Sequence, residues 1–154
     1  MVSTSGHRLI EESAVEVLKK RLFPLARVIT PNLPEAEILI GRAIPGESDF
    51  KAVAQELAET YDVSVLLKAG HLTDDILTDY FYNVEDNTLT LLPSKRVETK
   101  NTHGTGCTLS SAFAAALAKG EACRDDCIIE ILGVAHTESL ECRKNFGPCL
   151  FVKT

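Results

Sequence analysis

The sequence has no feature typical of a nucleic-acid-binding protein. Lys and Arg number 16 and Asp and Glu number 22, which gives a formal net charge of −6. The densest basic run, LKKR at residues 18–21, is typical of a solvated helix face. Because no stripe of basic residues appears, we expect no nucleic-acid partner.

Long apolar runs and a secretory leader are also missing. No stretch approaches the roughly 18 apolar residues that indicate a membrane-spanning helix. The first residues, MVSTSGHRLIEES, lack the basic-then-apolar order of a secretory signal. We therefore expect a cytoplasmic protein with no membrane span.

Paired cysteines are absent as well. The five cysteines form no CxxC pair and are odd in number, so free thiols in a reducing compartment fit better than a disulfide framework. Cys123 and Cys127 are four residues apart, but no further Cys or His follows closely enough to complete a zinc site. The remaining three are Cys107, Cys142 and Cys149.

What the sequence does contain is an alternation of helix and strand patterns, within a length that suits one domain over residues 1–154. We predict helices over residues 9–22, 34–40, 49–60, 106–119 and 126–140. We predict strands over residues 27–30, 63–67 and 95–99, and a β-hairpin over residues 76–84 and 88–92. This order is that of an α/β fold.

The first helix has an apolar stripe at helical spacing, which predicts the face that it buries. The stripe consists of Ala14, Val17, Leu18 and Leu22. Pro24 is expected to end this helix.

The predicted sheet is narrow for the number of helices. Only residues 27–30 and 63–67 have the apolar character of buried parallel strands, and the chain opens in a polar loop with no strand before its first helix. We therefore expect strands to be missing from the N-terminal side. A sheet edge left bare in this way favours self-association into homo-oligomers.

Residues 103–108, HGTGCT, join a glycine-rich turn to an alanine-rich helix. The first N–H groups of a helix are unpaired and carry partial positive charge, and glycines let an anion approach them. The same field favours a thiolate at Cys107, so an anion site beside a base is one interpretation. Close packing of the helix on a sheet is the other. The segment is not a P-loop, because GxxxxGK[ST] is absent.

Asn32 and Glu35 also allow two interpretations. As structure, Asn32 is a helix N-cap, Pro34 lies in the first turn and Glu35 completes a capping box, which the frequency of such caps favours. As function, their oxygens at a strand-to-helix junction are ligands suited to a hydrated Mg²⁺.

Lys68 follows the apolar run 63–67 directly, in the segment KAGH that also contains Gly70 and His71. Loops at the carboxyl end of a buried strand are where α/β proteins bind ligands, so Lys68 is a candidate phosphate contact. A lysine in a surface turn is the alternative.

Together these segments resemble one family, the hydroxymethylpyrimidine/phosphomethylpyrimidine kinases of thiamine biosynthesis in the ribokinase-like superfamily. The matching stretches are MVSTSGHRL, LFPLARVITPNLPEAEILIG, VLLKAGHLTDD, KNTHGTGCTLSSAFAAALAKG and the NFGP of the tail. The resemblance implies a ribokinase-like three-layer α/β sandwich. It implies that this chain is the C-terminal part of that fold, without the N-terminal strands.

The resemblance also implies an ATP- and Mg²⁺-dependent kinase that phosphorylates a pyrimidine alcohol, 4-amino-5-hydroxymethyl-2-methylpyrimidine, and then its monophosphate. It assigns the general base to Cys107, where many ribokinase relatives have aspartate. It assigns the anion hole to Gly104, Thr105 and Gly106. It assigns Mg²⁺ to Asn32 and Glu35, and the nucleotide to Lys68, Gly70 and His71.

Two alternatives remain open from the sequence. One is a thiol-bearing pyridoxine or pyridoxal kinase of the same superfamily. The motifs do not separate it from a pyrimidine kinase, because the resemblance implies that the residues selecting the acceptor lie in the N-terminal part of the fold, outside this chain. A non-catalytic remnant, which binds nucleotide weakly or not at all, is the second alternative.

Overall fold

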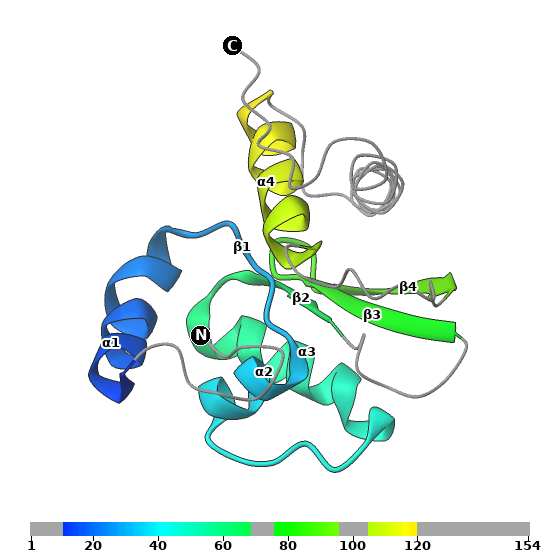
Figure 1. Ribbon diagram of the computed structural model, residues 1–154, viewed down its shortest axis with the longest axis horizontal. Coiled ribbons are helices and arrows are strands. Elements are labelled where there is room, and N and C mark those ends of the chain that lie inside the picture. The colour runs from blue at the N-terminus through cyan, green and yellow to red at the C-terminus, as the bar shows by residue number, and fades with distance from the viewer. Residues whose placement is uncertain (1–10, 69–75, 96–104, 120–154) are drawn as a thin grey trace. The chain divides into compact units, whose positions relative to one another are not determined.

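The computed structural model describes residues 11–68, 76–95 and 105–119. The chain divides into two units, Met1–Arg96 and Val97–Thr154, which are considered separately. The first unit contains a mixed sheet with helices preceding and connecting its strands, and the second contains one described helix (Figure 1). The helix predicted at residues 126–140 lies outside the described residues.

The described strands form one sheet in the order β1 (Val28–Ile29), β2 (Ser64–Leu67), β3 (Ile76–Asn83) and β4 (Thr88–Lys95). The first two pair in parallel, as predicted, and β3 and β4 form the predicted antiparallel hairpin. Asn87, in the turn between them, has a positive φ of 57°. The prediction of a separate strand over residues 95–99 was wrong at its first residue, because Lys95 is the last residue of β4. Residues 96–99 are not described.

Two helices follow their predicted boundaries closely. The first, α2 (Leu33–Ile40), ends at Gly41, which adopts the left-handed conformation (φ 75°) that terminates helices at little cost for glycine. The second, α3 (Phe50–Tyr61), follows a short 3₁₀ turn, η3 (Glu47–Asp49), and ends at Asp62 with φ 51°.

The first helical segment differs from the prediction. It consists of α1 (Glu12–Val17), a π-helical turn η1 (Leu18–Leu22) and a 3₁₀ turn η2 (Phe23–Leu25). The predicted buried stripe was wrong in part: Val17 and Leu22 are more than half exposed, whereas Leu18 packs against the core, and Val15 and Phe23 are buried. Pro24 lies inside η2, so the helical segment continues to Leu25, three residues past its predicted end at Leu22.

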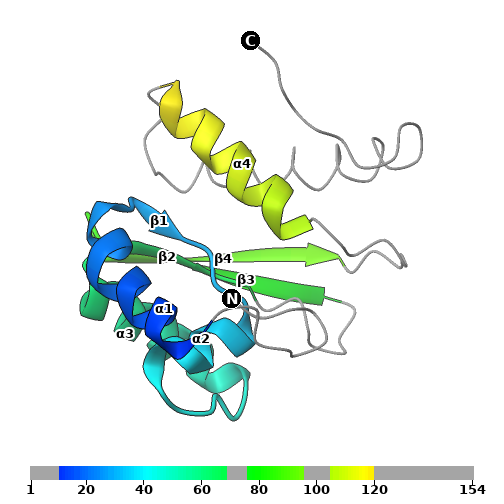
Figure 2. The ribbon, with the colours of Figure 1, turned by 60° about the vertical axis from the view of Figure 1, so that its left-hand side comes forward.

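The core of the first unit lies between α3 and one face of the sheet. Figure 2 shows α1, α2 and α3 on this face. The buried face of α3 is the predicted one, extended by Ala58, and consists of Phe50, Val53, Ala54, Leu57 and Ala58. Burial of each large apolar side chain contributes about 1.5–3 kcal/mol. The Phe50 ring meets Tyr80 of β3 edge-to-face, with ring centroids 5.6 Å apart.

β2 is buried on both faces, as its nearly all-apolar sequence predicted. Val65 and Leu67 belong to the core beneath α3, whereas Leu66, between them, points to the opposite face. Leu66 and its cross-strand partner Phe81 are both fully buried there.

In the second unit, α4 (Thr105–Ala118) begins and ends within one residue of the predicted helix. Leu109 and Phe113, four residues apart on one side of α4, are buried. No helix among the described residues is long and apolar enough to cross a membrane.

Candidate active site

The carboxyl ends of β1 and β2 lie side by side because the two strands pair in parallel. The pairing continues past both strands: the backbone N–H of Lys68 donates to the carbonyl oxygen of Pro31 at 2.9 Å, and Asn32 and Lys68 form an isolated parallel bridge. Two segments that are far apart in the sequence are therefore neighbours. Parallel α/β sheets bind ligands at this edge.

Asn32 is the N-cap of α2, as predicted, and it forms a complete capping box with Glu35. The backbone N–H of Glu35 donates to Asn32 Oδ1 at 2.9 Å, and the backbone N–H of Asn32 donates to Glu35 Oε2 at 3.1 Å. Each side chain thus satisfies a backbone donor that the helix would leave unpaired. The structural interpretation of this Asn-Glu pair is confirmed.

Glu35 is ionised at neutral pH. Burial raises the pKa of its carboxyl group, but the hydrogen bond from the Asn32 backbone and nearby positive charge, that of Lys68 included, lower the pKa further than burial raises it. The net pKa lies below the usual 4.5. A half-buried carboxylate is therefore held near a lysine at the carboxyl ends of two parallel strands.

These residues suit a hydrated Mg²⁺ better than a metal enclosed by protein. Mg²⁺ usually keeps several waters and is bound by one or two carboxylates together with substrate phosphates. Glu35 supplies an anionic carboxylate, whereas Asn32 Oδ1 is a neutral amide oxygen, and each accepts one backbone hydrogen bond of the capping box. Among the described residues no group of three or more His, Cys, Asp or Glu side chains is placed to hold a metal ion. Glu35 is therefore the residue through which an ion shared with phosphates would be held here.

The structure brings together only some of the residues singled out in the sequence. Asn32, Glu35 and Lys68 lie at one edge of the first unit. Thr105, Gly106 and Cys107 form the first turn of α4, which places the cysteine at a helix N-terminus as predicted. The other predicted site residues, Gly70, His71 and Gly104, lie outside the described residues.

One element of this site was not found from the sequence. The carbonyl of Pro31 fixes the backbone of Lys68, and no local motif indicates that contact. The only signal was indirect: each of the two segments follows a short apolar run.

Solved structures of small-molecule kinases share this mixed α/β fold. The chain resembles phosphomethylpyrimidine kinase from Clostridium difficile 630 with 34% identity and a TM-score of 0.69, over 92% of this chain and 54% of that one. It resembles the pyridoxal kinase from Staphylococcus aureus in complex with ADP with 28% identity and a TM-score of 0.73, over 94% and 50%. The chain therefore shares the mixed α/β fold of phosphomethylpyrimidine and pyridoxal kinases over about half of their length.

The chain belongs to the phosphomethylpyrimidine kinase family, whose sequence profile matches residues 1–128. It is 50% identical over 121 residues to the hydroxymethylpyrimidine/phosphomethylpyrimidine kinase of Rhizobium meliloti strain 1021, over 78% of this chain and 45% of that protein. It is 38% identical over 153 residues to the enzyme of that name from Salmonella typhimurium strain LT2, over 96% and 57%. The family resemblance is thus confirmed, and the chain spans about half the length of these relatives.

Proposed function

We propose that this chain supplies the nucleotide- and phosphate-binding part of an ATP- and Mg²⁺-dependent kinase that phosphorylates 4-amino-5-hydroxymethyl-2-methylpyrimidine and then its monophosphate. The observation that carries the proposal is the neighbouring placement of ionised Glu35 and Lys68 at the carboxyl ends of β1 and β2. Membership of the phosphomethylpyrimidine kinase family supports the choice of reaction.

The two opposite charges at the carboxyl ends of β1 and β2 have separate roles. Lys68 contacts the nucleotide's phosphates as a point charge, and Glu35 holds the hydrated Mg²⁺ that neutralises them. Asn32 keeps Glu35 in position through the capping box. Gly70 and His71, which follow Lys68 in the sequence, extend the nucleotide site.

In the second unit, the residues at the start of α4 carry out phosphoryl transfer. The N–H groups of Gly104, Thr105 and Gly106 stabilise negative charge on the transferred phosphoryl group. The thiolate of Cys107 accepts the proton of the hydroxymethyl group as its oxygen bonds to the γ-phosphorus. The bond from that phosphorus to the bridging oxygen breaks, and ADP leaves.

Family membership also supports an inference about the architecture and location of the protein. Residues 1–154 form one domain of a ribokinase-like three-layer sandwich, in which the strands of the unmatched part extend the sheet. The protein works in the cytoplasm with a pyrimidine alcohol and ATP as its ligands.

The two phosphorylations provide an internal control for Cys107. The first acceptor is an alcohol that must lose a proton, whereas the second is a phosphate monoester, largely ionised above its second pKa of about 6. In the chain joined to the unmatched part of a relative, a Cys107→Ala variant should slow the first transfer by about 10²- to 10⁴-fold, as expected for loss of a general base, and slow the second much less. Both rates are measured by chromatography of the mono- and diphosphate products formed from each acceptor.

An equal loss in both steps, or no loss in the first, would reject Cys107 as the base. Pyridoxal kinase is the competing function, because several solved pyridoxal kinases share the fold, including that from Bacillus subtilis with 33% identity. Phosphorylation of pyridoxal in preference to the pyrimidine would favour it. Absence of any transfer by the wild-type chain, together with absence of nucleotide binding, would favour the non-catalytic remnant.

A further inference from the structure

Asp79 is an acidic residue in the interior of β3, and aspartate is depleted in strands. The pairing with β4 fixes its position opposite Leu92, which is buried. The Asp79 side chain is itself partly buried. A carboxylate in such a place needs a partner that offsets the cost of removing it from water.

The register of β2 and β3 indicates a cationic partner, Lys68. Leu67 is the last residue of β2 and lies opposite Tyr80. In an antiparallel pair the next residue of one strand meets the preceding residue of the other, which brings Lys68 opposite Asp79. Leu67 and Tyr80 both belong to the core beneath α3. Because side chains alternate between faces, Lys68 and Asp79 share the other face of the sheet.

The backbone of β2 makes this a close pair. The N–H groups of Ser64 and Lys68 donate toward β1, to the carbonyl oxygens of Arg27 and Pro31, at 3.2 and 2.9 Å. Lys68 therefore does not donate to β3, and its position opposite Asp79 is of the non-hydrogen-bonded kind. The Cα atoms of such pairs are about 4.5 Å apart and their side chains approach closely. Opposite charges at these positions stabilise each other.

Lys68 thus lies between two acidic residues on different elements. Glu35 is at the start of α2, on the β1 side, and the charge of Lys68 contributes to the lowered pKa of its carboxyl group. Asp79 is on the other side, in the interior of a strand. The lysine ammonium is a point charge on a flexible four-carbon stem, so its position depends on the charges around it. A carboxylate on β3 offsets the attraction of Lys68 toward Glu35.

We propose that Asp79 is a positioning residue for phosphate binding by Lys68. Its carboxylate holds the ammonium group at the carboxyl end of β2, where Lys68 meets the nucleotide's phosphates while Glu35 stays available for Mg²⁺. Asp79 acts only through Lys68, because its own charge repels the phosphates. The inference rests on the proposed function, since it takes the nucleotide to bind at this edge of the sheet.

A double-mutant cycle on nucleotide affinity tests the proposal. Asp79→Asn, Lys68→Ala and the double variant of this chain are titrated with ATP and Mg²⁺. With Lys68 present, Asp79→Asn should weaken binding about two- to fivefold, the size expected for a cross-strand charge pair. In the Lys68→Ala background it should not weaken binding, because only repulsion between Asp79 and the phosphates is then removed. Asp79→Glu, which keeps the charge, should retain the wild-type affinity within about twofold.

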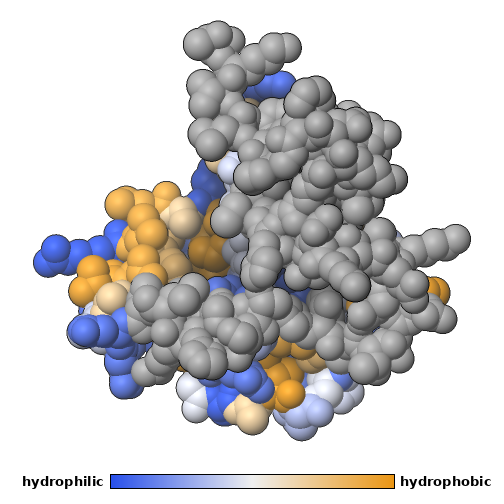
Figure 3. All heavy atoms as spheres, viewed as in Figure 1, coloured by the Kyte–Doolittle hydropathy of each residue, from blue (hydrophilic) through white to orange (hydrophobic). Residues whose placement is uncertain are grey.

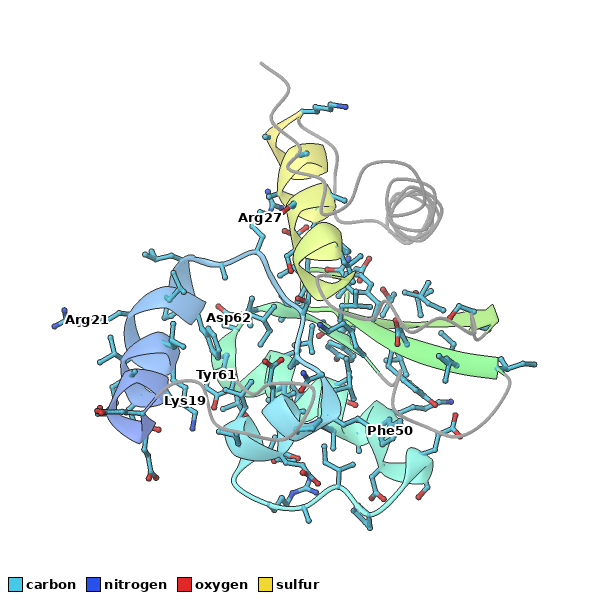
Figure 4. All side chains as sticks on the ribbon, viewed as in Figure 1. Lys19, Arg21, Arg27, Phe50, Tyr61 and Asp62 are labelled. Carbon is cyan, nitrogen blue, oxygen red and sulfur yellow. The ribbon has the colours of Figure 1, made fainter. Side chains whose placement is uncertain are left out.

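Asp62→Asn is the matched control, because it removes the same charge from the opposite end of β2. Asp62 follows α3 and is exposed, with a positive φ of 51° that asparagine tolerates (Figure 4). Its substitution should leave nucleotide affinity unchanged. Neither Asp-to-Asn change adds to the apolar surface exposed over the first helical segment (Figure 3), so self-association should not differ among these proteins.

A second cycle, measured by urea unfolding without nucleotide, tests the charge pair alone. Asp79→Asn should lower the unfolding midpoint when Lys68 is present and lower it less in the Lys68→Ala background. Equal weakening of nucleotide binding in both backgrounds would overturn the proposal, because Asp79 would then act through the fold. Unchanged binding in Asp79→Asn would also overturn it. Coupling in the unfolding cycle, with no nucleotide binding by the wild type, would support the pair and reject the proposed function.

Discussion

At the scale of single residues, Asn32 and Glu35 have a structural role that must be separated from any role toward Mg²⁺. Both side chains hold backbone N–H groups at the start of α2. Removing either one weakens the helix as well as the proposed site. A variant that keeps the hydrogen bond and removes only the charge distinguishes the two roles.

Glu35→Gln is that variant, because glutamine also serves at this position of a capping box. We expect it to lower the free energy of unfolding by about 0.3–1 kcal/mol through loss of a negative charge at the helix N-terminus. Glu35→Ala, which also loses the hydrogen bond, should cost about 1–2 kcal/mol. Urea unfolding gives both values. Both variants should lose Mg²⁺-dependent ATP binding; retention in Glu35→Gln would limit Glu35 to its structural role.

The pH dependence of the same pair gives a further test. Because the pKa of Glu35 is lowered in the folded protein, its carboxylate stabilises the fold above the unfolded pKa, and this contribution disappears as pH falls through the folded pKa. The stability advantage of the wild type over Glu35→Gln should therefore be full at pH 7. It should disappear once the pH falls below the folded pKa of Glu35, which lies below 4.5. A difference in unfolding free energy that does not change with pH would contradict the assignment of charge.

The capping box could be predicted because its partners are three residues apart and the motif is local. The contact between Pro31 and Lys68 could not, because it depends on the register of two strands separated by two helices. The sequence indicated that each segment follows an apolar strand, and only the parallel pairing of β1 and β2 makes them neighbours.

At the scale of elements, cap residues predicted α2, apolar spacing predicted α3, a nearly all-apolar run predicted β2 and turn residues predicted the hairpin. The first helical segment departed from its pattern. A helical wheel assumes a constant 3.6 residues per turn, and the π turn of η1 changes the phase between α1 and η2. Phe23 is buried after this change and packs edge-to-face on Tyr61 of α3, with ring centroids 5.1 Å apart. A local irregularity thus decided which apolar residues face the core.

The variant Tyr80→Phe tests the hydrogen bond that joins β3 to the turn before α3. The Tyr80 hydroxyl donates to Glu47 Oε1 at 2.9 Å, and burial, together with the hydrogen bond and charge of Glu47, raises the pKa of Tyr80 to about 12. We expect the variant to lose about 1 kcal/mol of unfolding free energy at neutral pH.

The sign of the pH effect follows from the raised pKa. The unfolded tyrosine loses its proton near 10.0 and the folded one near 12, so the stabilisation from Tyr80 is full below pH 10 and decreases as pH rises through that interval. The wild type and Tyr80→Phe should therefore converge in stability over this range in chemical unfolding experiments. Parallel curves would show that the hydroxyl is not held by Glu47.

At the scale of the whole molecule, the sequence predicted an α/β order with a shortage of parallel strands, and the described sheet has one parallel pair, β1 and β2. The family was recognisable because its motifs are long and continuous. The division into two units and the exposure of Val17, Leu22 and Leu25 were not predicted, since both depend on how distant segments pack.

Nucleotide binding at the carboxyl ends of β1 and β2 is tested most directly by calorimetric titration of the chain with ATP and Mg²⁺. Lys68→Ala is compared with Lys51→Ala, which removes the same charge from the exposed side of α3. We expect binding by the wild type and by Lys51→Ala, and binding about ten- to hundredfold weaker in Lys68→Ala. Equal affinities for the two lysine variants, or no binding by the wild-type chain, would contradict the account.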